Sequence, residues 1–190
     1  PGVEDIVRQQ ADDRDAEAFG FDLDGKVDAN DFTDPLTGEK GVDHEAARVF
    51  GCFDRTRGTL AEPPTNWSVR WGYYNLGNTW LIDVKGADNL KNDDDVEVSI
   101  YRGMQAAVKN GQGFQSHMTY DVDPDPRMQN NHFKGSIRNG MFVSDAPIDF
   151  FMISSPRLQP EFRFARARLR LSFNPDGSLE GFVGGFLPIT

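Results

Sequence analysis

The sequence contains a single cysteine among its 190 residues, so it can form neither an internal disulfide nor a thiolate metal cluster. Cys52 has Phe50 and Phe53 as close neighbours, which indicates a small buried apolar side chain rather than a nucleophile. No apolar run approaches the ~20 residues that a membrane-spanning helix needs. These absences leave a chain that must fold on its own apolar core.

Basic residues are in short supply. The chain has 20 Lys and Arg against 30 Asp and Glu, a formal net charge of -10 at pH 7. Because nucleic acids and anionic membranes attract basic surfaces, this charge argues against both as partners. A hydrophobic fraction of 38% with 26% charged residues is typical of a globular domain.

Motifs of catalysis are also missing. Ser154-Ser155 lacks the glycine elbow of a hydrolase, and no glycine loop of the kind that holds phosphate is present. The histidines His44, His117 and His132 are too scattered for a metal motif. Acidic residues are plentiful, yet none marks out a glycosidase pair. We therefore predict that the protein is not an enzyme.

Acidic residues recur at alternate positions in the segment 20–31. Calcium takes six to eight oxygen ligands, and a loop with an oxygen at every second residue and a glycine at its bend, here Gly25, can enclose one ion. On the twelve-residue EF-hand pattern, the predicted ligands are Asp22, Asp24, Lys26 through its carbonyl, Asp28 and Asp31. The alternative is a surface turn rich in Asp and Asn that binds nothing tightly.

The run 24–28 together with Asp31 resembles the calcium loop of dockerin modules, which also close with Asp. The similarity is local to residues 20–31. It implies calcium as the bound ion and does not imply a cellulosome module.

From Trp67 onward, apolar residues alternate with polar ones. Strand-like runs occur at 79–85, 96–101, 116–122, 132–138, 141–143, 148–153, 163–173 and 178–182. Asn139-Gly140 and Asn174-Pro175-Asp176-Gly177 are typical of hairpin turns. The sequence therefore predicts an antiparallel β-sandwich or jelly roll over 67–190. Residues 1–66 are expected to form an N-terminal arm with the acidic loop and a short helix over 43–50, capped by Asp43.

Two further acidic segments lie between predicted strands, at 88–95 and 121–125. Calcium would relieve the repulsion between their carboxylates, and loops at one end of a sandwich can share an ion. A second metal site at Asp93, Asp95, Asp121 and Asp123 is one interpretation, and solvated loops are the other.

Three arginines alternate with apolar residues in the strand predicted over 163–173. Arg166, Arg168 and Arg170 are expected on one face, opposite a row of apolar side chains. In an acidic protein they predict either pairing with acidic residues on the adjacent strand or binding of an acidic partner protein.

Aromatic residues gather in the first part of the predicted sandwich, at Trp67, Trp71, Tyr73, Tyr74 and Trp80. Exposed aromatic platforms combined with calcium are typical of carbohydrate-binding modules, so carbohydrate is an alternative ligand. An aromatic core is the competing interpretation.

The segments 21–25, 41–43 and 51–52, the run 92–101 and the Gly184-Gly185-Phe186 ending together resemble uncharacterised exported proteins of bacteria. The resemblance implies a periplasmic or extracellular location and a chain that continues past Thr190. The leading hypothesis is a non-enzymatic, exported, calcium-binding β-sandwich protein that serves as a structural or accessory subunit of a larger assembly.

Overall fold

The computed structural model describes residues 17–45, 79–111, 113–153 and 161–188. The chain divides into two compact units, Pro1–Val69 and Arg70–Thr190. The boundary expected after residue 66 and the helix expected over 43–50 lie wholly or mostly outside the described residues, as does the aromatic segment 67–74.

The first unit contains a small hairpin of β1 (Phe32–Thr33) and β2 (Lys40–Val42). Asp34 lies at the turn and is fully buried. Its carboxylate accepts hydrogen bonds from the backbone N–H groups of Leu36 and Thr37 at 2.9 and 3.0 Å, which compensate for its loss of water. Such a side-chain acceptor replaces the water that the turn amides would otherwise bind. The hairpin supports the acidic loop, which directly precedes it.

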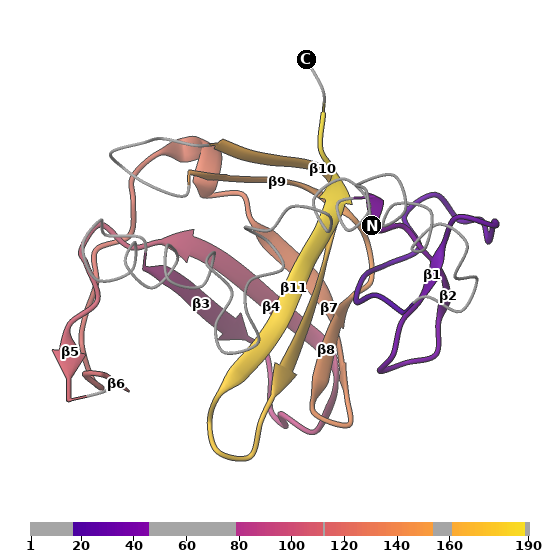
Figure 1. Ribbon diagram of the computed structural model, residues 1–190. Helices are drawn as coiled ribbons and strands as arrows, with labels where there is room; N and C mark the ends of the chain where they lie inside the picture. Colours follow the sequence, from indigo (N-terminus) through magenta and orange to yellow (C-terminus); the bar gives the residue numbers. More distant parts are fainter. Residues whose placement is uncertain (1–16, 46–78, 112, 154–160, 189–190) are drawn as a thin grey trace, which may run out of the picture. The chain divides into compact units, whose positions relative to one another are not determined.

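The second unit is an antiparallel β structure (Figure 1). Its strands and one short 3-10 helix are β3 (Trp80–Lys85), β4 (Asn92–Arg102), β5 (Lys109–Asn110), β6 (Gly113–Phe114), η1 (Pro126–Met128), β7 (His132–Arg138), β8 (Met141–Ser144), β9 (Ile148–Ile153), β10 (Glu161–Phe173) and β11 (Leu179–Phe186). The main sheet has the order β11-β10-β8-β7-β4-β3, and β9 pairs with β10 beside this path. The prediction of a mainly β, antiparallel sandwich is confirmed.

β10 is shared between the two layers of the sandwich. The first part of β10 pairs with β9, and its second part pairs with β8. On its opposite edge, β10 pairs with β11. An extra residue lies in β10 between Ala165 and Arg168, where Arg166 has φ of 52°. Such a bulge bends a strand and increases its twist, so β9 can turn back over the main sheet.

The core lies between these layers. Phe150 of β9 packs against Phe133 of β7 and Trp80 of β3, with ring centres 6.0 and 6.5 Å apart. The buried cluster comprises Val96, Val98, Ile100, Met128, Phe133, Ile137, Phe142, Phe150, Met152, Ile153, Ala167, Leu169 and Leu171. Alternate residues of β4 enter it, as the period of two in the sequence predicts.

Both predicted hairpin turns are confirmed. Asn139 and Gly140 join β7 to β8 with φ of 52° and 81°, the left-handed pair that a two-residue turn requires. Between β10 and β11, Gly177 has φ of 83°, and the Ser178 backbone N–H donates to the Asp176 carboxylate at 2.9 Å.

The strand predicted over 116–122 is wrong. That segment belongs to an arm that leaves the sheet after β4 and returns before η1, with the short β5–β6 hairpin at its end (Figure 1). Only Val122 forms a bridge there, with Gly103, and His117 adopts a left-handed φ of 59° that interrupts an extended strand.

Candidate metal site

The loop that follows Phe21 is shaped by its own carboxylates. Asp22 Oδ1 accepts the Gly25 backbone N–H at 2.6 Å, and Asp24 Oδ1 accepts the Lys26 backbone N–H at 2.8 Å. Gly25 has φ of 81°, a left-handed conformation that favours glycine at the bend. Each of these two aspartates therefore uses one oxygen to fold the loop, while its other oxygen has no backbone partner in the loop.

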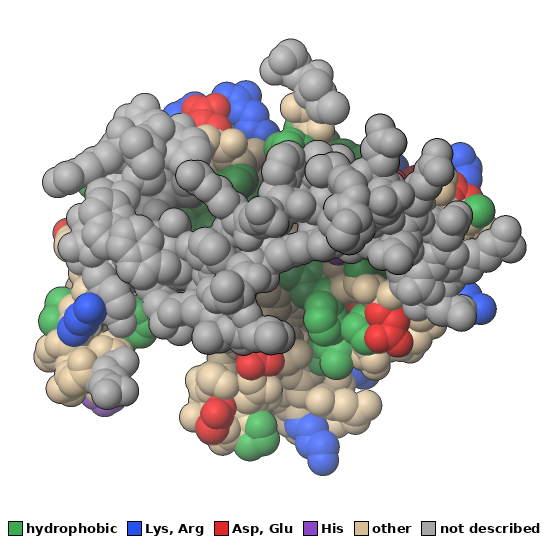
Figure 2. All heavy atoms as spheres, viewed as in Figure 1, with side chains coloured by type: hydrophobic (Ala, Val, Ile, Leu, Met, Phe, Trp, Pro, Cys, Tyr) green, Lys and Arg blue, Asp and Glu red, His purple; other side chains and the backbone are tan. Residues whose placement is uncertain are grey.

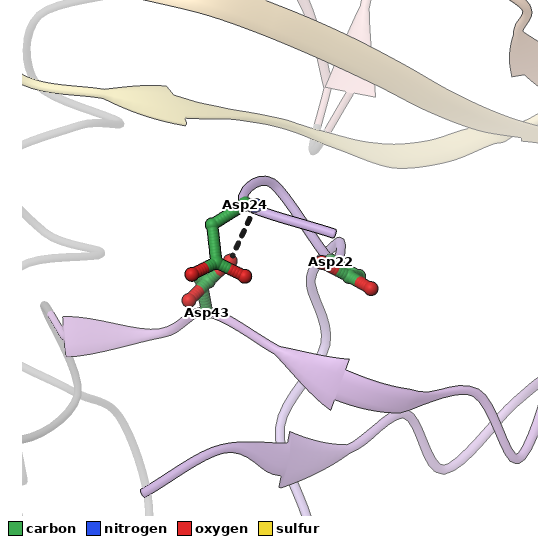
Figure 3. A group of neighbouring side chains, drawn as sticks. All are labelled: Asp22, Asp24 and Asp43. Carbon is green, nitrogen blue, oxygen red and sulfur yellow. Dashed lines mark hydrogen bonds between the residues drawn. The ribbon is translucent and has the colours of Figure 1, made fainter. Parts of the chain in front are cut away.

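A third carboxylate completes the cluster. Asp43, just after β2, accepts the backbone N–H groups of Leu23 and Asp24 through Oδ2 at 2.8 and 3.2 Å (Figure 3). Its own N–H donates to the Phe21 carbonyl at 3.0 Å. One ligand oxygen from each of Asp22, Asp24 and Asp43 can be chosen so that all lie within 4.8 Å of one another.

Gly41 allows the loop to approach β2. A Cβ at this position would lie 2.7 Å from the Lys26 carbonyl oxygen and 3.3 Å from Asp22 Oδ2, and Gly41 has φ of 85°. Any other residue would push the loop away and would strain the backbone. The sequence segment 41–43 thus supplies both the space and the third carboxylate.

The other predicted ligands lie elsewhere in the loop. Asp31 Oδ2 accepts the Asp28 backbone N–H at 2.5 Å, and Asp28 Oδ1 accepts the Asn30 backbone N–H at 2.8 Å. Among the described residues, neither belongs to the three-carboxylate cluster. The Lys26 carbonyl faces Gly41, and the Lys26 ammonium lies 3.9 Å from Asp24 Oδ2. Of the ligands predicted from the linear EF-hand pattern, Asp22 and Asp24 belong to the cluster, and its third member, Asp43, lies outside that pattern.

The second set of carboxylates is not brought together. Asp93 lies at the start of β4, whereas Asp123 pairs with Arg102 at its end. A strand rises about 3.3 Å per residue, so nine residues separate these points by roughly 30 Å. Asp93, Asp95, Asp121 and Asp123 thus cannot share one ion, and that interpretation is corrected.

Three of the four carboxylates, those of Asp93, Asp121 and Asp123, have structural contacts instead. The Asp93 carboxylate accepts the backbone N–H groups of Asp88 and Asp95 at 2.9 and 3.2 Å, and such bonds lower its pKa. Asp121 Oδ2 accepts the Gln105 side-chain amide at 2.6 Å. Asp123 is buried against Arg102, whose guanidinium also donates to the Ile153 carbonyl at 3.2 Å.

The three arginines of β10 do not form one exposed row. Arg166 is exposed on the bulge, with its guanidinium 6.0 Å from the Phe186 ring centre. The extra residue of the bulge separates Arg166 from Arg168 and Arg170. Arg168 is half-buried, and Arg170 is only 3% exposed, with its guanidinium 5.1 Å from the Phe182 ring centre. A surface made of all three is therefore not available to an acidic partner.

Trp80 is the one member of the predicted aromatic cluster that lies within the described residues. Trp80 is 37% exposed, and its ring packs against Phe150 of the core, which favours a role in packing. No helix within the described ranges is both long and apolar enough to span a bilayer.

Comparisons of the chain with protein-family models, with curated proteins and with solved structures gave no match.

Proposed function

We propose that the protein binds a divalent cation through Asp22, Asp24 and Asp43, and that calcium is this cation. The observation that carries the proposal is the convergence of these three carboxylates on one point from two separate segments. Hard oxygen donors suit calcium, which accepts irregular geometry and completes its shell with carbonyl oxygens and water. A softer metal would favour nitrogen or sulfur ligands.

The electrostatics of the cluster support the same proposal. Three carboxylates repel one another when they are ionised, and the Lys26 ammonium beside Asp24 is exposed to solvent. A bound cation would remove this repulsion and would hold the loop against β2. Binding therefore stabilises the first unit.

Other features of the chain support a proposal about its wider role. We place the protein outside the cytoplasm, as a non-enzymatic accessory subunit whose acidic loop is locked by calcium before it docks in a larger assembly. The acidic composition and the resemblance to exported bacterial proteins support this role. The millimolar calcium found outside cells suits a site with few protein ligands.

Calcium titration by calorimetry tests the metal proposal. The native chain should release or absorb heat, and Asp43→Asn and Asp24→Asn should abolish it. Asp28→Asn and Asp31→Asn are matched controls, because both lie in the same loop but outside the cluster. Circular dichroism should first establish that each variant keeps the β spectrum of the native chain.

The outcomes separate the two ligand sets. Loss of binding in Asp43→Asn with retention in Asp28→Asn supports the cluster. Equal loss in Asp28→Asn and Asp31→Asn would favour the linear loop instead. No heat and no rise of the melting temperature in millimolar calcium would refute calcium binding.

A further inference from the structure

Two Asn-Gly pairs occur at hairpin tips of the second unit, and the structure treats them differently. Asn110-Gly111 ends the arm, and Asn139-Gly140 joins β7 to β8. The two have similar sequence contexts, because a basic residue precedes each asparagine, Lys109 in one and Arg138 in the other. Any difference in their chemistry must therefore come mainly from the fold.

Asparagine before glycine is prone to a self-reaction of the chain. The backbone nitrogen of the glycine attacks the side-chain Cγ of the asparagine, and glycine offers no side chain to hinder the approach. The reaction requires that this nitrogen loses its proton and that the local backbone rotates. A hydrogen bond from the glycine N–H opposes the loss of the proton, and a rigid turn opposes the rotation of the backbone.

The Asn139-Gly140 turn is held on several sides. The Gly140 N–H donates to the Lys91 carbonyl at 2.9 Å, and the Asn139 N–H donates to the Asn92 side-chain carbonyl at 3.1 Å. The Gly140 carbonyl in turn accepts the Phe173 N–H at 2.8 Å. The nucleophile is thus engaged, and its backbone is fixed between two other segments.

Among the described residues, no such hydrogen bonds hold the Asn110-Gly111 pair. Asn110 and Gly111 are exposed, and no described atom would lie within 4 Å of a Cβ on Gly111. No hydrogen bond within the described ranges involves the Gly111 N–H or the Asn110 side chain. Within the described residues 108–111 and 113–115, the Gln115 N–H donates to the Val108 carbonyl, and the β5–β6 ladder joins two residue pairs.

We propose that Asn110 is a site of spontaneous deamidation, and that Asn139 is protected in the folded protein. The Gly111 nitrogen forms a bond to Asn110 Cγ while the Cγ–Nδ2 bond breaks. Ammonia leaves with the proton of the Gly111 amide, and a five-membered succinimide remains. Water then opens the ring at either carbonyl, which gives aspartate or isoaspartate at position 110.

The conversion would change the character of the arm. From Gly103 to Tyr120 the sequence contains no Asp or Glu, and Lys109 is its only Lys or Arg. Figure 2 shows the arm at the lower left with a basic side chain among apolar and uncharged ones. A carboxylate at position 110 would neutralise this charge, and an isoaspartate would lengthen the backbone where Asn110 pairs with Gly113.

Peptide mapping by mass spectrometry tests the proposal on the full chain. The protein is incubated at mildly alkaline pH, then digested with trypsin, which cuts after Lys109 and Arg138 and places each asparagine first in its own peptide. We expect conversion at Asn110 to be faster than at Asn139 by about tenfold or more, the factor that about 1.4 kcal/mol of barrier gives. An isoaspartyl methyltransferase assay identifies the isomer.

Two controls make the result decisive. In denaturant, where both turns are lost, the two sites should convert at similar rates, and Asn110→Gln should remove the reaction at that position. Equal native rates, a faster Asn139 or no conversion at Asn110 would overturn the proposal. A tenfold preference that persisted in denaturant would also overturn it, because sequence rather than structure would then be the cause.

Discussion

At the scale of single residues, one buried polar side chain connects three parts of the sandwich. Asn131 has no exposed surface, and its Nδ2 donates to the carbonyls of Ile100, Met128 and Phe151 at 3.3, 3.3 and 2.8 Å. Its Oδ1 accepts the Phe151 N–H at 3.1 Å. The Asn131 side chain therefore joins β4, η1 and β9 through hydrogen bonds to their backbone groups.

Asn131→Ala should destabilise the protein by roughly 2–4 kcal/mol, because Phe151 would lose partners for both backbone groups inside the protein. Urea denaturation measures the change. Asn89→Ala is the control, because Asn89 is exposed and its side chain accepts the Lys91 N–H at a surface turn. A loss below about 1 kcal/mol for Asn131→Ala would mean that water replaces the amide.

The candidate site shows how far a sequence pattern reaches at this scale. Asp22 and Asp24 could be identified because they are close in sequence to Gly25, and local spacing encodes a loop. Asp43 could not, because its position depends on the pairing of β2 with β1 and on the approach that Gly41 permits. The sequence pattern predicted Asp43 as a helix cap, and most of that helix lies outside the described residues.

At the scale of elements, β10 shows what periodicity can and cannot predict. Alternation in the sequence predicted a row of apolar side chains on one face of this strand, and Ala167, Leu169 and Leu171 lie in the buried core. It could not locate the extra residue at Arg166, because a bulge changes the face of every residue beyond it without changing the composition. Most strands were predicted from the same local alternation. The arm was wrongly predicted to contain a strand over 116–122, because polar and apolar residues alternate there as well.

At Gly181 of β11, an added Cβ would overlap the Arg170 carbonyl oxygen of β10. Gly181→Ala should therefore cost at least about 1–3 kcal/mol of stability. Gly113→Ala is the matched control: this glycine is exposed in β6, has no atom within 4 Å of its Cβ position, and should change stability by less than about 0.5 kcal/mol. Thermal melting of both variants checks the difference. Equal stabilities would show that the two strands can separate at no cost.

At the scale of the whole molecule, carboxylates with lowered pKa values set the response to acid. Hydrogen bonds from Arg127 lower the pKa of Asp125 from 3.8 to about 2. Arg163 lowers the pKa of Glu161, and Ser178 lowers that of Asp176. Each group binds its proton more weakly in the folded protein than in the unfolded chain. Its contribution to stability is therefore present above its pKa in the unfolded chain, and is lost as the pH falls through its pKa in the folded protein.

The melting temperature should therefore fall as the pH decreases from about 4 to about 2. Asp125→Asn should lower the melting temperature at neutral pH. Between about pH 4 and about pH 2, the melting temperature of this variant should fall by less than that of the native chain. Calorimetric scans at several pH values test this expectation. Parallel acid profiles for the two proteins would contradict the assignment to Asp125.

Calcium, in contrast, should act on one unit alone. A ligand that binds only the folded state stabilises it by RT ln(1 + [L]/Kd), about 2.7 kcal/mol at a hundredfold excess over Kd. Hydrogen exchange should slow at the amides of Leu23, Asp24 and Gly25 when calcium is added, and the amides of β4 and β7 should serve as the internal reference. Equal slowing throughout would mean that the ion acts on the protein in general.

The order of strands in the main sheet also has a consequence for folding kinetics. The chain visits β3, β4, β7, β8, β10 and β11 in the order in which they lie side by side, with β5, β6 and β9 as excursions. Three of these neighbouring pairs, β3–β4, β7–β8 and β10–β11, are joined by short connections, so each can nucleate on its own. The slow events should then be the two longer loop closures, one around the arm between β4 and β7 and one around β9 between β8 and β10. A shorter arm would be expected to speed folding while leaving the unfolding rate almost unchanged.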